Sequence, residues 1–179
     1  MIIDKISPGV NPPHDINVVI EIPGGPGGGQ PVKYEIDKDT GALTVDRIVN
    51  VPMFYPNNYG FVPNTLHQDG DPVDVMVRTE VTLVPGSVIR CRLIGVLHME
   101  DDGGIDDKLI ALPIEKVDPF QSEINDLDDL PVRHRERIWH FFEHYKALEV
   151  GKWATIIGWG DKAEAEAILM DSIARAGKD

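Results

Sequence analysis

Hydrophobic and polar residues alternate with a period of two through much of the chain between residues 17 and 115. Such alternation is typical of β-strands that bury one face. The pattern predicts short strands within residues 17–23, 31–38, 42–49, 71–78, 87–99 and 107–114. Because no helical pattern separates these segments, we expect them to form a small closed or partly closed barrel.

A glycine-rich segment, residues 24–30, separates the first two predicted strands. Glycine reaches positive φ at little cost, so the segment predicts a hairpin turn. A phosphate-binding loop would need a Lys followed by Ser or Thr at the start of a helix, whereas this segment leads into Pro31 and a strand. The hairpin would bring Glu21, Lys33 and Glu35 to one side of a sheet.

After residue 125 the hydrophobic period becomes helical, through Ile138, Phe141, Phe142, Tyr145 and Leu148. This spacing predicts a helix over about residues 130–148, ended before Gly151. A second helix is predicted over 162–176, where Asp161 can cap the N-terminus and Glu164 occupies the reciprocal capping position. Strands followed by helices indicate the α+β class.

Length and composition fit one domain spanning residues 1–179. The chain has 30 acidic and 17 basic residues, a net charge of −13. This charge opposes binding to nucleic acid and to anionic membranes, so we expect neither partner. No apolar run approaches a membrane span, no signal-peptide pattern is seen, and Cys91 is the only cysteine. These features predict a cytoplasmic protein.

The segment HFFEH, residues 140–144, matches the H-x-x-E-H pattern of inverted zinc peptidases. On a helix His140 and His144 would share a face, and Glu143 could act as a base. The alternative is an amphipathic helix whose histidines pack or face a partner. We favour this alternative because a pattern with three fixed positions arises often by chance.

The segment DGDPVDV, residues 69–75, concentrates three carboxylates. Turn chemistry accounts for Asp69 and partly for Asp71, but not for Asp74, which lies opposite an apolar strand face. The spacing does not match a helix–loop–helix calcium site, whereas Mg²⁺ shared between carboxylates and a phosphate accounts for all three. Carboxylates two residues apart in an extended chain, roughly 6–7 Å, can bracket two metal ions.

DGDPVDV and several further segments resemble the soluble family I inorganic pyrophosphatases of the bacterial type. The similar segments follow in order along nearly the whole chain: VVIEIP, KYEIDKDTGAL, PMFYPNNYGF, PGSVIRCR and HFFEHYKALEVGKW. The glycine-rich segment looks like an insertion that varies within the family. The resemblance implies a five-stranded, OB-like β-barrel with two flanking C-terminal helices. It also implies Mg²⁺-dependent hydrolysis of inorganic pyrophosphate to two orthophosphates.

The resemblance further implies three to four Mg²⁺ ions per active site, with Mn²⁺ or Zn²⁺ as substitutes. The implied metal-binding residues are Asp69, Asp74, Asp106, Asp101 and Glu35, with Glu21 in the outer ligand shell. The implied phosphate-binding residues are Lys33, Arg47, Tyr55, Lys108, Tyr145 and Lys146, with Tyr59 lining the site. Asp71 would accept a proton from the attacking water or orient it.

Two other functions are weighed beside this one. A non-catalytic barrel that binds an anion or calcium would bind metal without turnover, and a zinc peptidase would act through His140, Glu143 and His144. The resemblance also implies a homohexamer of two stacked trimers. Three histidines on a second sector of the predicted helix, His134, His140 and His144, are a candidate subunit contact.

Overall fold

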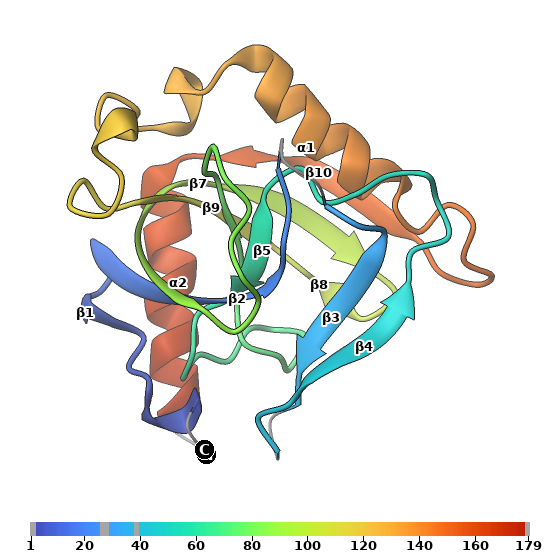
Figure 1. Ribbon diagram of the computed structural model, residues 1–179, viewed down its shortest axis with the longest axis horizontal. Helices are drawn as coiled ribbons and strands as arrows, with labels where there is room; N and C mark the ends of the chain where they lie inside the picture. The colour runs from blue at the N-terminus through green and yellow to red at the C-terminus, as the bar shows by residue number, and fades with distance from the viewer. Residues whose placement is uncertain (1–2, 26–28, 38–39, 178–179) are drawn as a thin grey trace.

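Five strands close into a ring in the computed structural model, which describes residues 3–25, 29–37 and 40–177. They are β2 (Asp15–Ile22), β5 (Asn58–Phe61), β6 (Asp74–Val77), β9 (Lys108–Pro113) and β7 (Val88–Asp101). Each strand pairs with the next in this order, and the long β7 pairs with both β9 and β2, which closes the ring. The predicted five-stranded barrel and the α+β class are therefore confirmed (Figure 1).

Further elements extend or cover this ring. Strands β1 (Gly9–Asn11), β8 (Gly104–Ile105) and β10 (Ala154–Gly160) add to β2 and β7, and α1 (Val132–His144) and α2 (Lys162–Ala176) follow late in the chain. Three short 3₁₀ helices are η1 (Ile3–Lys5), η2 (Pro119–Gln121) and η3 (Leu127–Asp129). Within the described residues, neither helix has the length and apolar character that a membrane span requires.

Strand β3 (Val32–Ile36) pairs with β4 (Leu43–Ile48) in a separate two-stranded sheet beside the barrel. The predicted hairpin between β2 and β3 is therefore wrong. The physical reason is that both edges of β2 are already hydrogen-bonded, one to β5 and the other to β7. Residues 26–28 of the predicted turn lie outside the described residues.

Four of the observed strands were not predicted from the sequence: β1, β5, β8 and β10. All four residues of β5 are buried, so its sequence shows no alternation of apolar and polar side chains. Within β5, Gly60 lies so close to β2 that a Cβ there would be 1.8 Å from the carbonyl oxygen of Val19. A residue without a side chain is thus required for this strand to complete the ring.

The second helix has the predicted bounds and the first is shorter than predicted. The Asp161 carboxylate accepts a hydrogen bond from the Glu164 N–H at 2.9 Å, and the Glu164 carboxylate accepts one from the Asp161 N–H at 3.2 Å. This reciprocal cap confirms the predicted start of α2. In contrast, α1 ends at His144, and Leu148 is 63% exposed, so its assignment to the apolar helix face was wrong.

Alternate side chains of the central strands enter two apolar clusters. Val75 of β6 and Leu109 of β9 pack in the cluster that includes α2, whereas Met76 and Ile110 pack in the cluster that includes α1. These four side chains are completely buried. Burial of side chains of this size stabilises a fold by about 1.5–3 kcal/mol each, so the strands that lead to the barrel mouth are held from both faces.

Candidate active site

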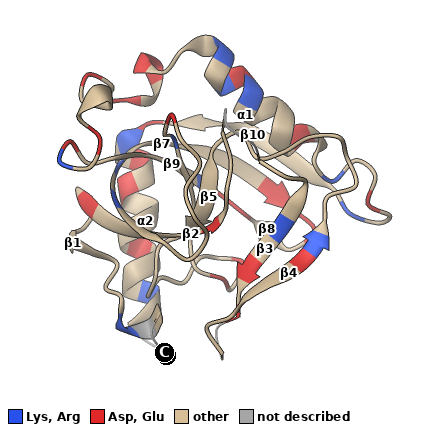
Figure 2. Ribbon diagram, in the orientation of Figure 1, with Lys and Arg blue, Asp and Glu red and all other residues tan. Residues whose placement is uncertain are grey.

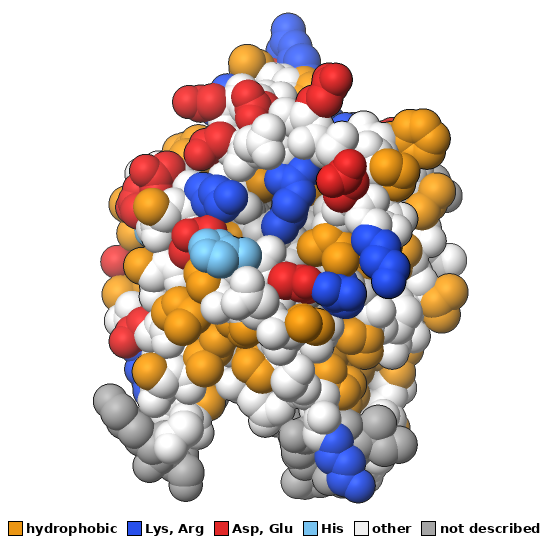
Figure 3. All heavy atoms as spheres, turned by 90° about the vertical axis from the view of Figure 1, so that its left-hand side faces the viewer, with side chains coloured by type: hydrophobic (Ala, Val, Ile, Leu, Met, Phe, Trp, Pro, Cys, Tyr) orange, Lys and Arg blue, Asp and Glu red, His pale blue; other side chains and the backbone are white. Residues whose placement is uncertain are grey.

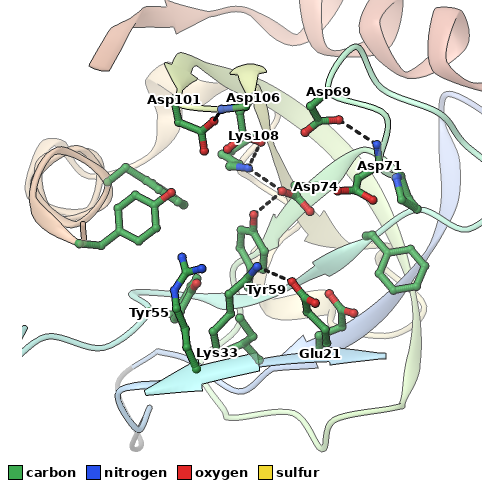
Figure 4. A pocket seen from close by; sticks show the side chains of 18 of the residues that line it. Glu21, Lys33, Tyr55, Tyr59, Asp69, Asp71, Asp74, Asp101, Asp106 and Lys108 are labelled. Carbon is green, nitrogen blue, oxygen red and sulfur yellow. Dashed lines mark hydrogen bonds and ion pairs between the residues drawn. The ribbon is translucent and has the colours of Figure 1, made fainter. Parts of the chain in front are cut away.

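A pocket of about 550 Å³ opens beside the barrel, between the ring, the β3–β4 sheet and the end of α1 (Figure 4). It is lined by all of the site residues that the resemblance implies: Glu21, Lys33, Glu35, Arg47, Tyr55, Tyr59, Asp69, Asp71, Asp74, Asp101, Asp106, Lys108, Tyr145 and Lys146. Among these implied residues, Glu21 and Lys146 are 125 positions apart in the chain, yet they line one cavity. Charges of both signs mark β3 and β4 at its edge (Figure 2).

The pocket gathers carboxylates from several elements. On the face of the molecule shown in Figure 3, acidic and basic side chains lie next to one another in the upper half, and hydrophobic side chains are more numerous in the lower half. On this face acidic side chains have basic neighbours, as on an ordinary solvated surface, whereas the pocket holds its carboxylates close together.

Lys108 lies at the centre of the acidic group. Strands β6 and β9 run parallel, with Asp74 opposite Lys108 in register. The Lys108 ammonium donates to Asp74 Oδ2 at 2.5 Å and also to the Asp106 carboxylate. The Tyr59 hydroxyl donates to the same Asp74 oxygen at 2.5 Å. A single buried cation is therefore shared by two carboxylates (Figure 4).

Burial makes negative charge costly here. It raises the pKa of Asp106, which Lys108 lowers and Asp74 raises further. Burial also raises the pKa of Glu21 to about 8, against the lowering effect of the Ile36 N–H that donates to it at 2.7 Å. Burial alone would lower the pKa of Lys108, but Asp74 and Asp106 outweigh it and raise the value. The carboxylates exceed the positive charge available to them, which is the condition that added cations relieve.

Asp69 and Asp71 stand on a tight turn that enters β6. The Asp71 N–H donates to Asp69 Oδ1 at 3.0 Å, and Gly70 between them has φ +95°, a conformation that favours glycine. The turn chemistry expected for Asp69 is present. It orients both carboxylates toward the pocket that Asp74 also lines.

Asp101, at the end of β7, accepts a hydrogen bond from the Lys146 ammonium at 2.6 Å. Its neighbour Asp102 accepts one from Lys146 at 3.0 Å and also pairs with Lys152. Burial acts to raise the pKa of Asp101, but Lys146 lowers it overall. Asp102 and Lys152 line the pocket and were missed from the sequence, although Asp102 belongs to the same acidic turn as Asp101.

The opposite side of the pocket is cationic. Lys33 of β3 pairs with Glu35 two residues on, and its ammonium lies 3.4 Å from an Asp46 oxygen. On β4, Arg47 Nε lies 3.2 Å from Glu149 Oε1, which belongs to the turn after α1. Lys33 and Arg47 are paired opposite one another across the two strands, so both face the same cavity.

Tyrosines line the pocket between these charged groups. Tyr55 packs on Tyr59 and Phe141 with ring centroids 5.1 and 4.6 Å apart. Burial raises the pKa of Tyr55, Tyr59 and Tyr145. Their hydroxyls therefore stay protonated near neutral pH and act as hydrogen-bond donors.

The zinc-peptidase pattern lies outside this pocket. His140, Glu143 and His144 are exposed on α1, where the two imidazole centroids are 4.6 Å apart. Throughout the described residues, no three His, Cys, Asp or Glu side chains already stand at metal-binding distances from a common point. In the pocket, Asp74 and Asp106 are instead paired with Lys108. Their carboxylate oxygens are nevertheless the kind of ligand that Mg²⁺ prefers.

His134, the third histidine considered as a subunit contact, is half-buried rather than exposed. Burial, with Arg78 and Arg137 nearby, lowers its pKa to about 4. It is therefore neutral at pH 7, and its half-buried position differs from the exposed positions of His140 and His144.

Comparisons with known proteins agree with this site. Residues 18–177 match the model of the family described as inorganic pyrophosphatase. The chain is 53% identical to the inorganic pyrophosphatase of Xanthomonas campestris, over 99% of this chain and 98% of that protein. It is 54% identical to the inorganic pyrophosphatase of Gluconobacter oxydans, over 98% and 99% of the two chains. A crystal structure of the inorganic phosphatase from Anaplasma phagocytophilum, 44% identical, superposes with a TM-score of 0.93 over 97% of this chain and 99% of that one. The chain belongs to the inorganic pyrophosphatase family.

Proposed function

We propose that this protein hydrolyses inorganic pyrophosphate to two orthophosphates with the help of divalent metal ions. The observation that carries the proposal is a pocket in which carboxylates from the barrel face lysine and arginine from the β3–β4 sheet. Carboxylates suit hard cations, and the cations suit a polyanionic phosphate substrate. The family to which the chain belongs supports the same activity.

Mg²⁺ is the proposed metal, with three to four ions per site and Mn²⁺ or Zn²⁺ as substitutes. The residues proposed to hold these ions are Asp69, Asp74, Asp106, Asp101 and Glu35, with Glu21 in a supporting position. The raised pKa values of Asp106 and Glu21 support this fit, because an added cation offsets the cost of their buried negative charge.

When bound, such ions lower the pKa of the attacking water and neutralise charge on the phosphates. Asp71 is the proposed proton acceptor or orienting group for this water. Its turn places it beside Asp69 and Asp74 on the side of the pocket that faces the cations. The local hydrogen bond from the Asp71 N–H to Asp69 holds this geometry independently of substrate.

Lys33, Arg47, Lys108 and Lys146 are proposed to bind the phosphate oxygens, with the hydroxyls of Tyr55 and Tyr145 and with Tyr59 lining the site. Each of the four cations already has a carboxylate partner in this structure. In substrate binding Lys108 exchanges Asp74 and Asp106 for a phosphate oxygen. These cations then stabilise the negative charge that develops on the leaving phosphate during hydrolysis.

We further propose that the protein acts in the cytoplasm, as one domain per chain, in a homohexamer of two stacked trimers. Support for the assembly comes from the exposed His140 and His144 and the apolar groove beside them, which includes Met53 and Phe54. Light scattering at micromolar concentration and pH 7.5 tests it, and a monomer would contradict it.

Phosphate release from pyrophosphate, measured with and without Mg²⁺, tests the activity. The expected result is turnover that requires Mg²⁺ and that Mn²⁺ or Zn²⁺ supports in its place. Metal binding without turnover would instead indicate a non-catalytic barrel that binds an anion or calcium. Peptide-bond cleavage that a zinc-selective chelator abolishes and that does not require Mg²⁺ would revive the zinc-peptidase interpretation.

A further inference from the structure

Behind the acidic side of the pocket lies a second group of titratable side chains, His67, Asp107 and His98, which takes no part in the function proposed above. Asp107 stands between Asp106 and Lys108 at the start of β9. Successive side chains of an extended chain point to opposite sides, so Asp107 points away from the pocket that its two neighbours line. Its side chain is only 8% exposed.

His98 of β7 holds this buried carboxylate. Its Nδ1 lies 3.0 Å from Asp107 Oδ1, and its Nε2 lies 3.3 Å from Glu164 Oε2 in the first turn of α2. The His98 imidazole packs directly against Gly160, where a Cβ would lie only 2.5 Å from His98 Nε2. A buried carboxylate is costly without a partner, and His98 supplies one on the side away from the pocket.

His67 connects this arrangement to the turn that carries Asp69 and Asp71. The His67 N–H donates to the Asp71 carbonyl at 2.7 Å, and the His67 carbonyl accepts from the Gly70 N–H at 3.2 Å. The His67 side chain is 3% exposed, and its Nε2 lies 3.8 Å from Asp107 Oδ2. Among the described residues this Nε2 has no hydrogen-bond partner, and Asp107 is the carboxylate it faces.

We propose that His67, Asp107 and His98 are positioning residues that hold the two acidic segments of the pocket, the 69–71 turn and Asp106, at a fixed separation. The His67 backbone closes the 69–71 turn through its hydrogen bonds to Asp71 and Gly70. His98 holds the Asp107 side chain and thereby fixes the backbone between Asp106 and Lys108. Groups that support metal-binding side chains from behind commonly change metal affinity by about 10–100-fold when they are removed. This inference rests on the proposed function, since it assumes that these carboxylates bind divalent ions.

The test is Mg²⁺ binding measured by calorimetry in the absence of substrate, together with kcat at saturating Mg²⁺. Asp107→Ala and His98→Ala are expected to weaken the first Mg²⁺ site about tenfold, at the lower end of that range, because they act through the backbone. At saturating Mg²⁺, kcat should stay close to that of the unchanged protein. His98→Asn keeps a nitrogen near the Nδ1 position and should restore most of the affinity, whereas His98→Gln should not.

Two control variants alter His–Glu pairs that do not include Asp107. Glu164→Gln alters the outer, 56% exposed partner of His98, and His14→Ala removes an exposed His–Glu pair whose closest atoms are 3.3 Å apart. Both should bind Mg²⁺ with unchanged affinity. If Asp107→Ala does not fold, Asp107→Asn and the two His98 amide variants give the same comparison.

Folded variants at Asp107 and His98 that bind Mg²⁺ as tightly as the unchanged protein would overturn the inference and leave the proposed function intact. A fall in kcat with unchanged Mg²⁺ affinity would overturn it as well. If the unchanged protein itself neither bound Mg²⁺ nor released phosphate, the proposed function would be wrong.

Discussion

Asp74 begins β6 and Asp106 lies just before β9, two neighbouring strands of the barrel. On the opposite side of the pocket, Lys33 and Arg47 belong to the two-stranded β3–β4 sheet beside the barrel. We call the first side the barrel wall (Asp69, Asp71, Asp74, Asp101, Asp106) and the second the β3–β4 wall (Lys33, Glu35, Arg47). Strand β6 of the barrel wall is paired on both edges. On β4, in contrast, Leu43, Val45 and Ile48 are exposed.

The β3–β4 wall is attached to the rest of the chain by the packing of Ile36 with Val19 and Phe61 and by a few polar contacts. The Ile36 N–H donates to Glu21 at 2.7 Å, and Arg47 pairs with Glu149. The difference matches the demands that the proposed function makes on the two walls. Small divalent ions such as Mg²⁺ need ligands in a narrow geometry, which dense packing supplies. A phosphate substrate needs positive charge that can be rearranged, and long side chains on a less buried sheet supply it.

The largest effect is expected for Asp71→Asn, on the barrel wall. It should keep the fold and most of the metal binding but lower kcat by about 10²–10⁴-fold if Asp71 acts as a general base. Steady-state phosphate release at pH 7.5 measures this, with the exposed Asp128→Asn as the matched control. A variant with nearly full rate would remove Asp71 from the mechanism.

Lys108→Met tests whether the barrel wall needs a cation for stability. Removing one partner of a buried charge group leaves Asp74 and Asp106 uncompensated, which should destabilise the metal-free protein by about 3–5 kcal/mol. Mg²⁺ should restore part of this loss, because it binds the folded state. Urea unfolding with and without Mg²⁺ measures both quantities, and the exposed Lys116→Met serves as control. Equal free energies of unfolding for the two variants without metal would show that Asp74 and Asp106 do not need the Lys108 charge for stability.

On the β3–β4 wall, Arg47→Ala should raise KM for pyrophosphate by roughly tenfold to a hundredfold, the range expected for one charge-assisted hydrogen bond. Mg²⁺ binding without substrate should not change, because Arg47 pairs with Glu149 and Asp46 and touches none of the barrel-wall carboxylates. The control is Arg133→Ala, whose side chain is 92% exposed. Loss of tight Mg²⁺ binding in a folded Arg47→Ala protein would show that the two walls are not separate in function.

The smallest effect concerns His134, which lies outside both walls. Its pKa of about 4 in the folded chain is below the ordinary value near 6.5, so the unfolded chain binds more protons between these pH values. The stability that neutral His134 contributes is therefore complete above about pH 6.5 and is lost as pH falls toward about 4. Because the side chain is partly exposed, screening should limit the effect to about 1 kcal/mol.

The measurement is the free energy of unfolding at pH 7.5 and 4.5 for the unchanged protein and for His134→Gln, with the exposed His14→Gln as control. His134→Gln should lose less stability at the lower pH. An identical loss in all three proteins would place the acid sensitivity entirely in other groups, such as those of the pocket.

Local chemistry was enough to predict several elements from the sequence. The α2 bounds follow from Asp161 and Glu164, whose reciprocal hydrogen bonds join residues three apart. Strands β6, β7 and β9 follow from apolar side chains that any pairing partner would bury. The candidate site residues followed from the resemblance, which depends on short segments that each carry their own functional groups.

The pairing of strands was decided by the tertiary structure, because it depends on which edges are already in use. Strand β3 follows β2 closely in the chain, yet β5 and β7 occupy both edges of β2 and leave β3 to pair with β4. The sharing of Lys108 between Asp74 and Asp106 depends likewise on the parallel register of β6 with β9, across 34 positions of sequence. Sequence alone was enough to propose the candidate site residues, whereas long-range pairing and burial decided which charges meet and what their pKa values become.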